Sequence, residues 1–331
     1  MRTDTPFLGA VLNAVTRGHL HNGEPKGEFD RITDIDTYVA KPAEGKANGN
    51  IILYVCLLAH VATQRTHYQT ATFPMSLASS PTGKFREIQS LLLVVVLTGV
   101  AIDYVCALPA YNCSRQRLTS LAYAVVCDAF AEAGYTTIGI DYFEGDPIYM
   151  HRDGPKTPVE GFDFEAWLAK SNKFAVAHVD DWISAVKQKY GKPDTKYACV
   201  GYCFGAPYVM NAITPKGSSP PACEVGAFAH PAFLKEHHFE NITKPLFLSC
   251  AETDFTFETD ARNKALTILR EAKKPYSLQL FSGVEHGFAL RCDLSSSHER
   301  WCKEQSQRGI ADYFDLQLGV FEKNSQQESK L

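Results

Sequence analysis

Hydrophobic and polar positions along this chain switch repeatedly between the two-residue period of strands and the longer period of helices. Short, uninterrupted apolar runs rich in β-branched and aromatic residues are typical of strands that are covered on both faces. They predict buried strands over residues 50–55, 135–141, 197–202, 225–229 and 246–250. Alternation of apolar and polar residues predicts half-exposed strands over residues 35–41 and 276–281.

Apolar positions at helical spacing lie between these strands. Asp163 is a suitable N-cap for a long amphipathic helix that ends at Tyr190. Further helices are predicted over residues 258–272 and 297–318, and residues 128–134 have the pattern of a helix end stopped by glycine. This alternation predicts an α/β fold with a mostly parallel central sheet, helices on both faces, and ligands at the carboxyl ends of the strands.

Residues 56–127 do not show this alternation of strands and helices, and they affect the expected domain organisation. Residues 56–127 contain few acidic side chains, many serines and threonines, and no sustained period, so we interpret them as an atypical insertion. With 331 residues and 45% hydrophobic content, the chain can bury a large core. We predict a flexible N-terminus over residues 1–22, a single domain over residues 23–320 that contains the insertion, and a polar tail over residues 321–331.

Charge narrows the class of partner. The formal net charge is −4 and the sequence has no basic cluster, which argues against binding to nucleic acid or to an anionic membrane and favours a small-molecule partner. The apolar patch at residues 7–15 follows Asp4 and is interrupted by Asn13, which disfavours a signal peptide. The apolar run at residues 91–102 is too short to span a bilayer. We expect a cytoplasmic protein, either a monomer or a homodimer.

The ten cysteines lack the spacing of a disulfide framework or a zinc site. There is no C-x-x-C pair, so the sequence predicts no bound metal and fits a reducing compartment. Most free cysteines in proteins are buried core residues, and Cys199 and Cys250, which lie inside predicted strands, are expected to have that role.

Cys203 is the exception, because of the glycines around it. Gly201 and Gly205 bracket it between a predicted strand and a helix start, which is the glycine spacing of a nucleophile elbow. In such an elbow the nucleophile has strained φ and ψ angles, and side chains at the bracketing positions would collide with the neighbouring strand and helix. The partial positive charge of the helix N-terminus favours a thiolate. The pattern therefore predicts a catalytic cysteine.

A cysteine nucleophile needs a base, and the base needs a carboxylate that orients it. His286 follows the strand predicted over residues 276–281, and Asp254 follows the strand predicted over residues 246–250, so both are expected at the edge of the sheet that carries the cysteine. Glu252 and Glu285 are alternatives for the acid. His230 follows the strand at 225–229 and is a candidate for the pocket, although a capping role fits it equally well.

At these residues the sequence resembles the dienelactone hydrolase family of α/β hydrolases, especially its fungal branch. The resemblance covers residues 23–55 and 128–318, and it is carried by three blocks: Gly-Tyr-Cys-Phe-Gly-Ala at 201–206, Ala-Glu-Thr-Asp at 251–254 and Glu-His-Gly-Phe-Ala-Leu-Arg at 285–291. The order nucleophile, acid, histidine is that of the α/β hydrolases. The resemblance implies an α/β-hydrolase fold and a catalytic triad of Cys203, Asp254 and His286.

The same resemblance implies a chemistry. The expected reaction is hydrolysis of a lactone, a cyclic anhydride or a small activated ester through an acyl-cysteine intermediate, with no metal or organic cofactor. A fungal setting would place the substrate in aromatic catabolism or secondary metabolism. Phe204 would donate its amide to the oxyanion, Tyr202 would lie in the pocket, and Arg291 would hold a substrate carboxylate. In the bacterial pattern this arginine comes one residue earlier, so Arg291 fits it loosely.

Residues 56–127 are where the sequence departs from the family pattern. They replace a short loop with an acidic residue and a Phe-Gly pair, which in the family supplies an oxyanion-hole amide. One interpretation is a lid over the pocket. Another is translated intervening sequence, because Val55-Cys56 can be encoded by bases that resemble a splice donor. The departure also supports an alternative function, a small-molecule-binding protein without useful turnover. Turnover of an activated aryl ester would distinguish the two functions.

Overall fold

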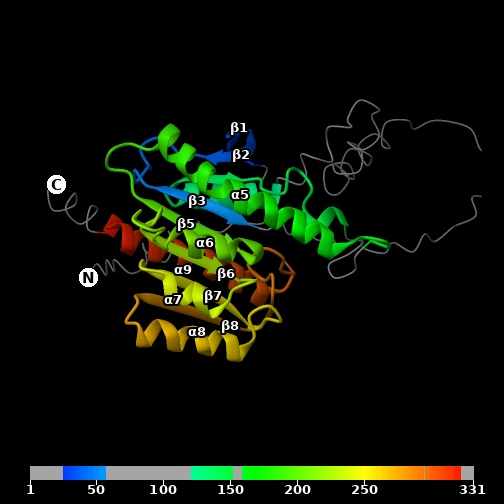
Figure 1. The fold of residues 1–331 in the computed structure, drawn as a ribbon. Helices are drawn as coiled ribbons and strands as arrows, with labels where there is room; N and C mark the ends of the chain where they lie inside the picture. Colours follow the sequence, from blue (N-terminus) through cyan, green and yellow to red (C-terminus); the bar gives the residue numbers. More distant parts are fainter. Residues whose placement is uncertain (1–24, 57–120, 152–158, 294, 322–331) are drawn as a thin grey trace, which may run out of the picture. The chain divides into compact units, whose positions relative to one another are not determined.

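One mixed sheet organises the part of the chain that the computed structural model describes, residues 25–56, 121–151, 159–293 and 295–321. Eight strands of this part form the sheet in the order β1-β2-β4-β3-β5-β6-β7-β8 (Figure 1). All of the described residues belong to one compact unit. The α/β-hydrolase architecture predicted from the sequence is therefore confirmed.

The strands are β1 (Glu28–Ile32), β2 (Ile35–Ala40), β3 (Ile51–Cys56), β4 (Thr136–Ile140), β5 (Tyr197–Tyr202), β6 (Val225–Ala229), β7 (Leu246–Thr253) and β8 (Tyr276–Glu285). The helices are α4 (Leu121–Glu132), α5 (Phe164–Tyr190), α6 (Ala206–Ala212), α7 (Glu236–Asn241), α8 (Thr259–Glu271) and α9 (Ser297–Leu318), with short 3₁₀ turns at Ile148–His151 and Cys203–Gly205.

The connections explain the directions of the strands. β1 and β2 are antiparallel and are joined by Thr33 and Asp34, both with positive φ (50° and 64°), as in a type I′ hairpin turn. β2 also runs antiparallel to β4, whereas the strands from β4 through β3 and β5 to β8 pair in parallel. Parallel neighbours need long crossovers, and helices supply them from β4 onward. The carboxyl ends of these strands therefore meet along one edge of the sheet.

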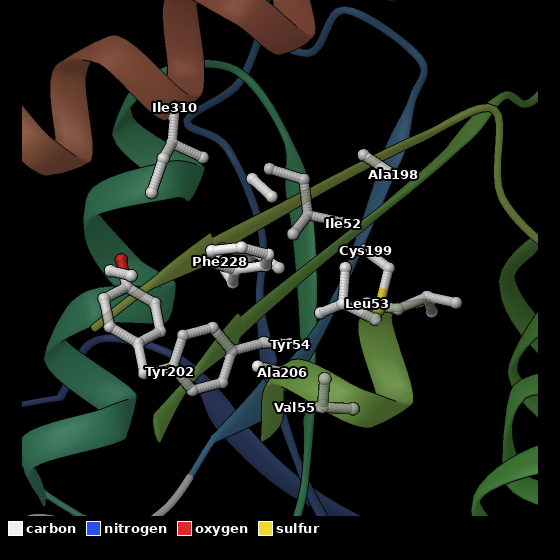
Figure 2. Close-up of a cluster of buried hydrophobic side chains, with 14 of the residues drawn as sticks. Ile52, Leu53, Tyr54, Val55, Ala198, Cys199, Tyr202, Ala206, Phe228 and Ile310 are labelled. Atoms are coloured by element: carbon white, nitrogen blue, oxygen red, sulfur yellow. The ribbon is translucent and has the colours of Figure 1, made fainter. Parts of the chain in front are cut away.

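Helices cover both faces of the sheet. On one face, α6 packs against β5, where a Cβ on Gly201 would lie 2.7 Å from Val209. On the other face, α9 reaches β7, where the hydroxyls of Ser249 and Ser306 are 2.7 Å apart. α4 shares that second face, because the rings of Phe130 and Phe314 are in contact at 6.5 Å. The middle strands are thus sealed from solvent on both sides, and Figure 2 shows the resulting core around β3, β5 and β6.

Several element bounds match the sequence-based predictions. The helix predicted over residues 297–318 is α9, and the long helix α5 is capped by Asp163, whose Oδ1 accepts a hydrogen bond of 2.9 Å from the Ala166 amide. β7 and β8 run further than predicted, to Thr253 and Glu285. The apolar pattern of β7 stops at Ala251, but its backbone stays paired with β8 as far as Thr253.

The predicted insertion is described only at its ends. Helix α4 begins at Leu121, so residues 121–127 belong to a helix of the domain rather than to the insertion. Residues 57–120, together with residues 1–22 and most of the tail at 321–331, lie outside the described residues. No helix in the described part is long and apolar enough to cross a membrane.

Candidate active site

The carboxyl end of β5 forms a sharp turn at Cys203. β5 ends at Tyr202, and Cys203 begins a single 3₁₀ turn that leads directly into α6. Its φ is +51°, a left-handed conformation that is costly for a residue with a side chain. A Cβ on Gly201 would lie 2.8 Å from the Gly205 carbonyl carbon, so the first bracketing glycine is required for this turn. The elbow predicted from the glycine spacing is present.

His286 lies at the end of β8 and faces the thiol. Its Nε2 is 3.1 Å from Cys203 Sγ, and its backbone amide donates to the Thr253 carbonyl at 3.1 Å, which ties the turn to β7. The next residue, Gly287, has a φ of +96°, and a Cβ there would lie 2.4 Å from a guanidinium nitrogen of Arg291. Glycine therefore lets the chain turn sharply after the histidine and lets Arg291 pack against that turn.

Asp254 directly follows β7 and contacts the His286 ring on the side away from Cys203. Its Oδ1 accepts a hydrogen bond of 2.9 Å from Nδ1 of His286. The same oxygen accepts from the amides of Thr256 and Phe257 at 2.9 and 3.2 Å. The side chains of His286 and Asp254 are only 3% and 2% exposed, so water does not compete for these bonds.

These contacts set the protonation of the histidine. Burial of the ring disfavours its charged form, but the hydrogen bonds to Asp254 and Cys203 outweigh that effect and raise the pKa of His286 to about 9. At neutral pH the ring therefore carries protons on both nitrogens. Nδ1 donates to the carboxylate and Nε2 faces the sulfur.

Thr256 joins this network, although sequence reasoning missed it. Its hydroxyl lies 2.7 Å from Oδ1 of Asp254, 2.8 Å from Nδ1 of His286 and 2.7 Å from the Pro231 carbonyl. It therefore holds both the acid and the base while linking the β7 loop to the β6 loop. Its position two residues after the aspartate is the signal that a search for side-chain turns could have found.

The two rival carboxylates occupy other places. Glu252 is exposed on β7 and accepts a hydrogen bond of 3.1 Å from the Gly283 amide. Glu285 is exposed at the end of β8. Asp254 is the carboxylate that contacts the imidazole.

Tyr202 and His230 support the site from within the core, since each is 1% exposed. The His230 ring packs against His286 at 5.1 Å, nearly perpendicular, and against Tyr202 at 5.7 Å. Neither of its ring nitrogens has a hydrogen-bond partner among the described residues. Burial, reinforced by the positive charges of His286 and Arg291, moves the pKa of His230 well below its ordinary value. Its ring is therefore neutral beside the charged His286.

Phe204 follows Cys203, and its side chain is also buried. Its ring packs against Tyr142, Phe143 and Tyr208 at 5.2 to 5.5 Å, which anchors the turn in an aromatic cluster. On the other side of the elbow, β3 ends at Cys56, whose register partner is Tyr202. The segment that follows β3 replaces the loop that supplies an oxyanion-hole amide in the family pattern, and it lies outside the described residues. No cluster of potential metal ligands occurs in the described part of the chain.

Comparisons with known proteins agree with one another. The model of the dienelactone hydrolase family matches residues 121–316. Dienlactone hydrolases 1 and 2 of Gibberella moniliformis are each 30% identical to this chain, over 303 and 301 residues, and each alignment covers 91% of this chain and 92% of the relative. The solved structure of a candidate dienelactone hydrolase from Klebsiella pneumoniae superposes on this chain with a TM-score of 0.53 at 11% sequence identity. The superposition covers 87% of this chain and 97% of the Klebsiella chain. At that identity the similarity concerns the fold alone.

Proposed function

The chain belongs to the dienelactone hydrolase family and is an ester or lactone hydrolase; from this premise we propose that Cys203 is its nucleophile and that it acts on a lactone, a cyclic anhydride or a small activated ester. The observation that carries the proposal is the unbroken row from Cys203 Sγ to His286 Nε2 at 3.1 Å and from His286 Nδ1 to Asp254 Oδ1 at 2.9 Å. Nucleophile, base and orienting acid in this contact are the requirement for acyl transfer.

In the first half of the reaction, the Cys203 thiolate attacks the carbonyl carbon and forms a C–S bond. The carbonyl electrons move to the oxygen, and the Phe204 amide donates a hydrogen bond to this oxyanion. When the carbonyl re-forms, the C–O bond breaks and the imidazolium of His286 gives its Nε2 proton to the departing alkoxide. The products of this half are the acyl-cysteine and a neutral imidazole.

In the second half, the neutral imidazole acts as a base toward water. His286 Nε2 takes a proton from the water as its oxygen attacks the acyl carbon. The C–S bond then breaks, and the thiolate leaves with its electron pair while the acid product departs. Asp254 keeps the imidazole in the tautomer with Nδ1 protonated throughout, so Nε2 is always the nitrogen that exchanges the proton.

Arg291 supplies a positive charge for an acidic substrate group. Its guanidinium packs against Gly287, directly after the catalytic histidine. Its Nε is buried and has no hydrogen-bond partner among the residues described. A substrate carboxylate next to His286 would satisfy this donor.

The test is capture of the acyl-enzyme. We expect 4-nitrophenyl acetate to be hydrolysed, and an acid-quenched reaction to carry one acetyl group on the peptide that contains Cys203. The matched control is Cys199→Ala, which should still be acetylated at Cys203. Acetylation of another residue during turnover would overturn the nucleophile, and binding of the ester without turnover would favour the binding-protein alternative.

A further inference from the structure

Two phenylalanine rings beside the triad are exposed to solvent. Phe255 directly follows Asp254, is 77% exposed, and has its ring 5.1 Å from the His286 ring. Phe233 is 44% exposed, and its ring lies 6.0 Å from that of Phe204. One exposed ring thus touches the base, and the other touches the residue after the nucleophile.

The backbone that presents Phe233 is strained and is fixed to the nucleophile. Phe233 has a φ of +62°, which is unusual for a bulky residue, and His230 in the same turn has a φ of +36°. The Ala232 amide donates to the Cys203 carbonyl at 3.0 Å, so this turn is positioned by the elbow itself. Strain of this kind persists where the surrounding structure imposes it, and it is concentrated at functional sites.

The two loops are also fixed to each other. The Thr256 hydroxyl, next to Phe255, lies 2.7 Å from the Pro231 carbonyl, two residues before Phe233. Each phenylalanine is therefore held on a loop that hydrogen-bonds either the nucleophile or the other loop. Neither ring carries a polar group, so what they recognise is apolar.

We propose that Phe233 and Phe255 form an aromatic clamp that holds a planar, unsaturated ring of the substrate's acyl part beside Cys203. Aromatic side chains favour other flat π systems in offset or edge-to-face contact at centroid distances of about 4.5–7 Å. The clamp acts on the acyl part because that part stays bonded to Cys203 until water arrives. This inference rests on the proposed function and adds the class of substrate to it.

The experiment compares vinyl acetate, vinyl benzoate and vinyl cyclohexanecarboxylate, which share one leaving group. The last two differ in whether the six-membered ring is planar. Because each variant is compared with the wild type on the same ester, intrinsic reactivity cancels. We expect Phe255→Ala to lower kcat/KM for the benzoate about fivefold more than for the acetate, mainly through KM. Phe233→Ala should have an effect of the same direction and order.

Two further variants keep the test decisive. Phe255→Leu retains an apolar side chain without a ring, so it should lose the preference for benzoate over cyclohexanecarboxylate. Phe29→Ala removes a ring that is 55% exposed on β1 and should change none of the three rates. Equal losses on all three esters in Phe255→Ala would overturn the clamp. Absence of hydrolysis of every ester by the wild type would instead overturn the proposed function.

Discussion

Cys199 and Cys203 belong to the same strand and turn, yet their surroundings differ completely. Cys199 lies inside β5, is fully buried (Figure 2), and has a thiol whose pKa is raised well above its ordinary value by hydrogen bonding with Cys223 and by burial. Cys203 lies just past the end of the strand, where its Sγ faces a histidine that carries a proton at neutral pH. The residue type is the same, and the environment determines the chemistry.

This difference shows that the place of a cysteine in the backbone, inside a strand or at the elbow, determines its role. Inside the strand a cysteine behaves as a small apolar side chain, and Cys250 in β7 repeats this, since burial raises its pKa to about 12. At the elbow, the positive φ of Cys203 turns its side chain toward the edge of the sheet where β7 and β8 end, next to Asp254 and His286. The predictions below test this contrast, from the largest effect to the smallest.

Cys203→Ala should remove nearly all activity, because in the proposed mechanism Cys203 alone forms the acyl intermediate. We expect kcat/KM for 4-nitrophenyl acetate to fall by about 10⁴-fold or more. The matched change, Cys199→Ala, should leave kcat/KM intact and lower the free energy of unfolding by about 1 kcal/mol, measured by urea denaturation. Similar kinetic losses in both variants would erase the distinction between the two cysteines.

His286→Ala should be the next most damaging change, since the imidazole moves a proton in both halves of the proposed reaction. Loss of a positioned general acid and base costs about 10²–10⁴-fold in kcat. Asp254→Asn should cost less, because the carboxylate orients the ring and does not itself exchange a proton. Steady-state kinetics with Glu252→Gln and Glu285→Gln as controls checks this assignment. A fall in kcat in either control equal to that of Asp254→Asn would assign the acid role to that glutamate instead.

Alkylation should separate the cysteines directly. With limiting iodoacetamide at neutral pH, the folded protein should be labelled at Cys203 at least about tenfold faster than at Cys199 or Cys250, because only a thiolate reacts quickly. Peptide mapping by mass spectrometry gives the ratio. In denaturant the preference should disappear, and its persistence there would show that local sequence rather than the fold activates the thiol.

The pH profile should reveal the charged partner of Cys203. Since the pKa of His286 is about 9, the imidazolium is present below this pH and is lost above it. We therefore expect kcat/KM to be sustained through neutral pH and then to fall by about tenfold per unit of pH above 9. Stopped assays between pH 6 and 10.5 would measure this. A fall that begins near pH 6.5 as the pH rises would mean that the histidine titrates as in free solution.

Thr256→Val should have the smallest effect. It removes one hydroxyl that contacts Asp254, His286 and the Pro231 carbonyl. A hydrogen bond of this kind is worth about 0.5–1.5 kcal/mol, so we expect kcat to fall by about two- to tenfold. Thr256→Ser restores the hydroxyl and should restore kcat. Failure of the serine variant to recover activity would mean that the threonine methyl group, and not the hydroxyl, supports the triad.

The main elements of this fold could be predicted because they rest on local signals. Buried parallel strands such as β5 and β6 are short apolar runs, and α5 begins at the N-cap Asp163, so both could be located from the sequence. β1 could not, because its sequence Glu-Phe-Asp-Arg-Ile is polar and its strand character comes from pairing with β2 at the edge of the sheet. The short helix α7 likewise lacks a periodic pattern.

The candidate site likewise contains residues that the sequence predicts and contacts that it does not. Cys203, Asp254 and His286 were predictable because each follows a strand whose carboxyl end converges on one edge. The role of Thr256 depends on a contact with Pro231, and the burial of His230 depends on its packing against His286 and Tyr202. These contacts join residues from different strands, and no local period encodes them.

The left-handed backbone at Cys203 also limits which nucleophiles evolution can place in this enzyme. A positive φ is tolerated by a residue with an unbranched Cβ but is strongly disfavoured for one with a branched Cβ. Serine could therefore replace cysteine at this elbow without moving the chain, whereas threonine, which carries the same hydroxyl, would have to strain or reshape the turn. The elbow thus disfavours threonine and admits cysteine or serine, two side chains that differ by one atom, sulfur or oxygen.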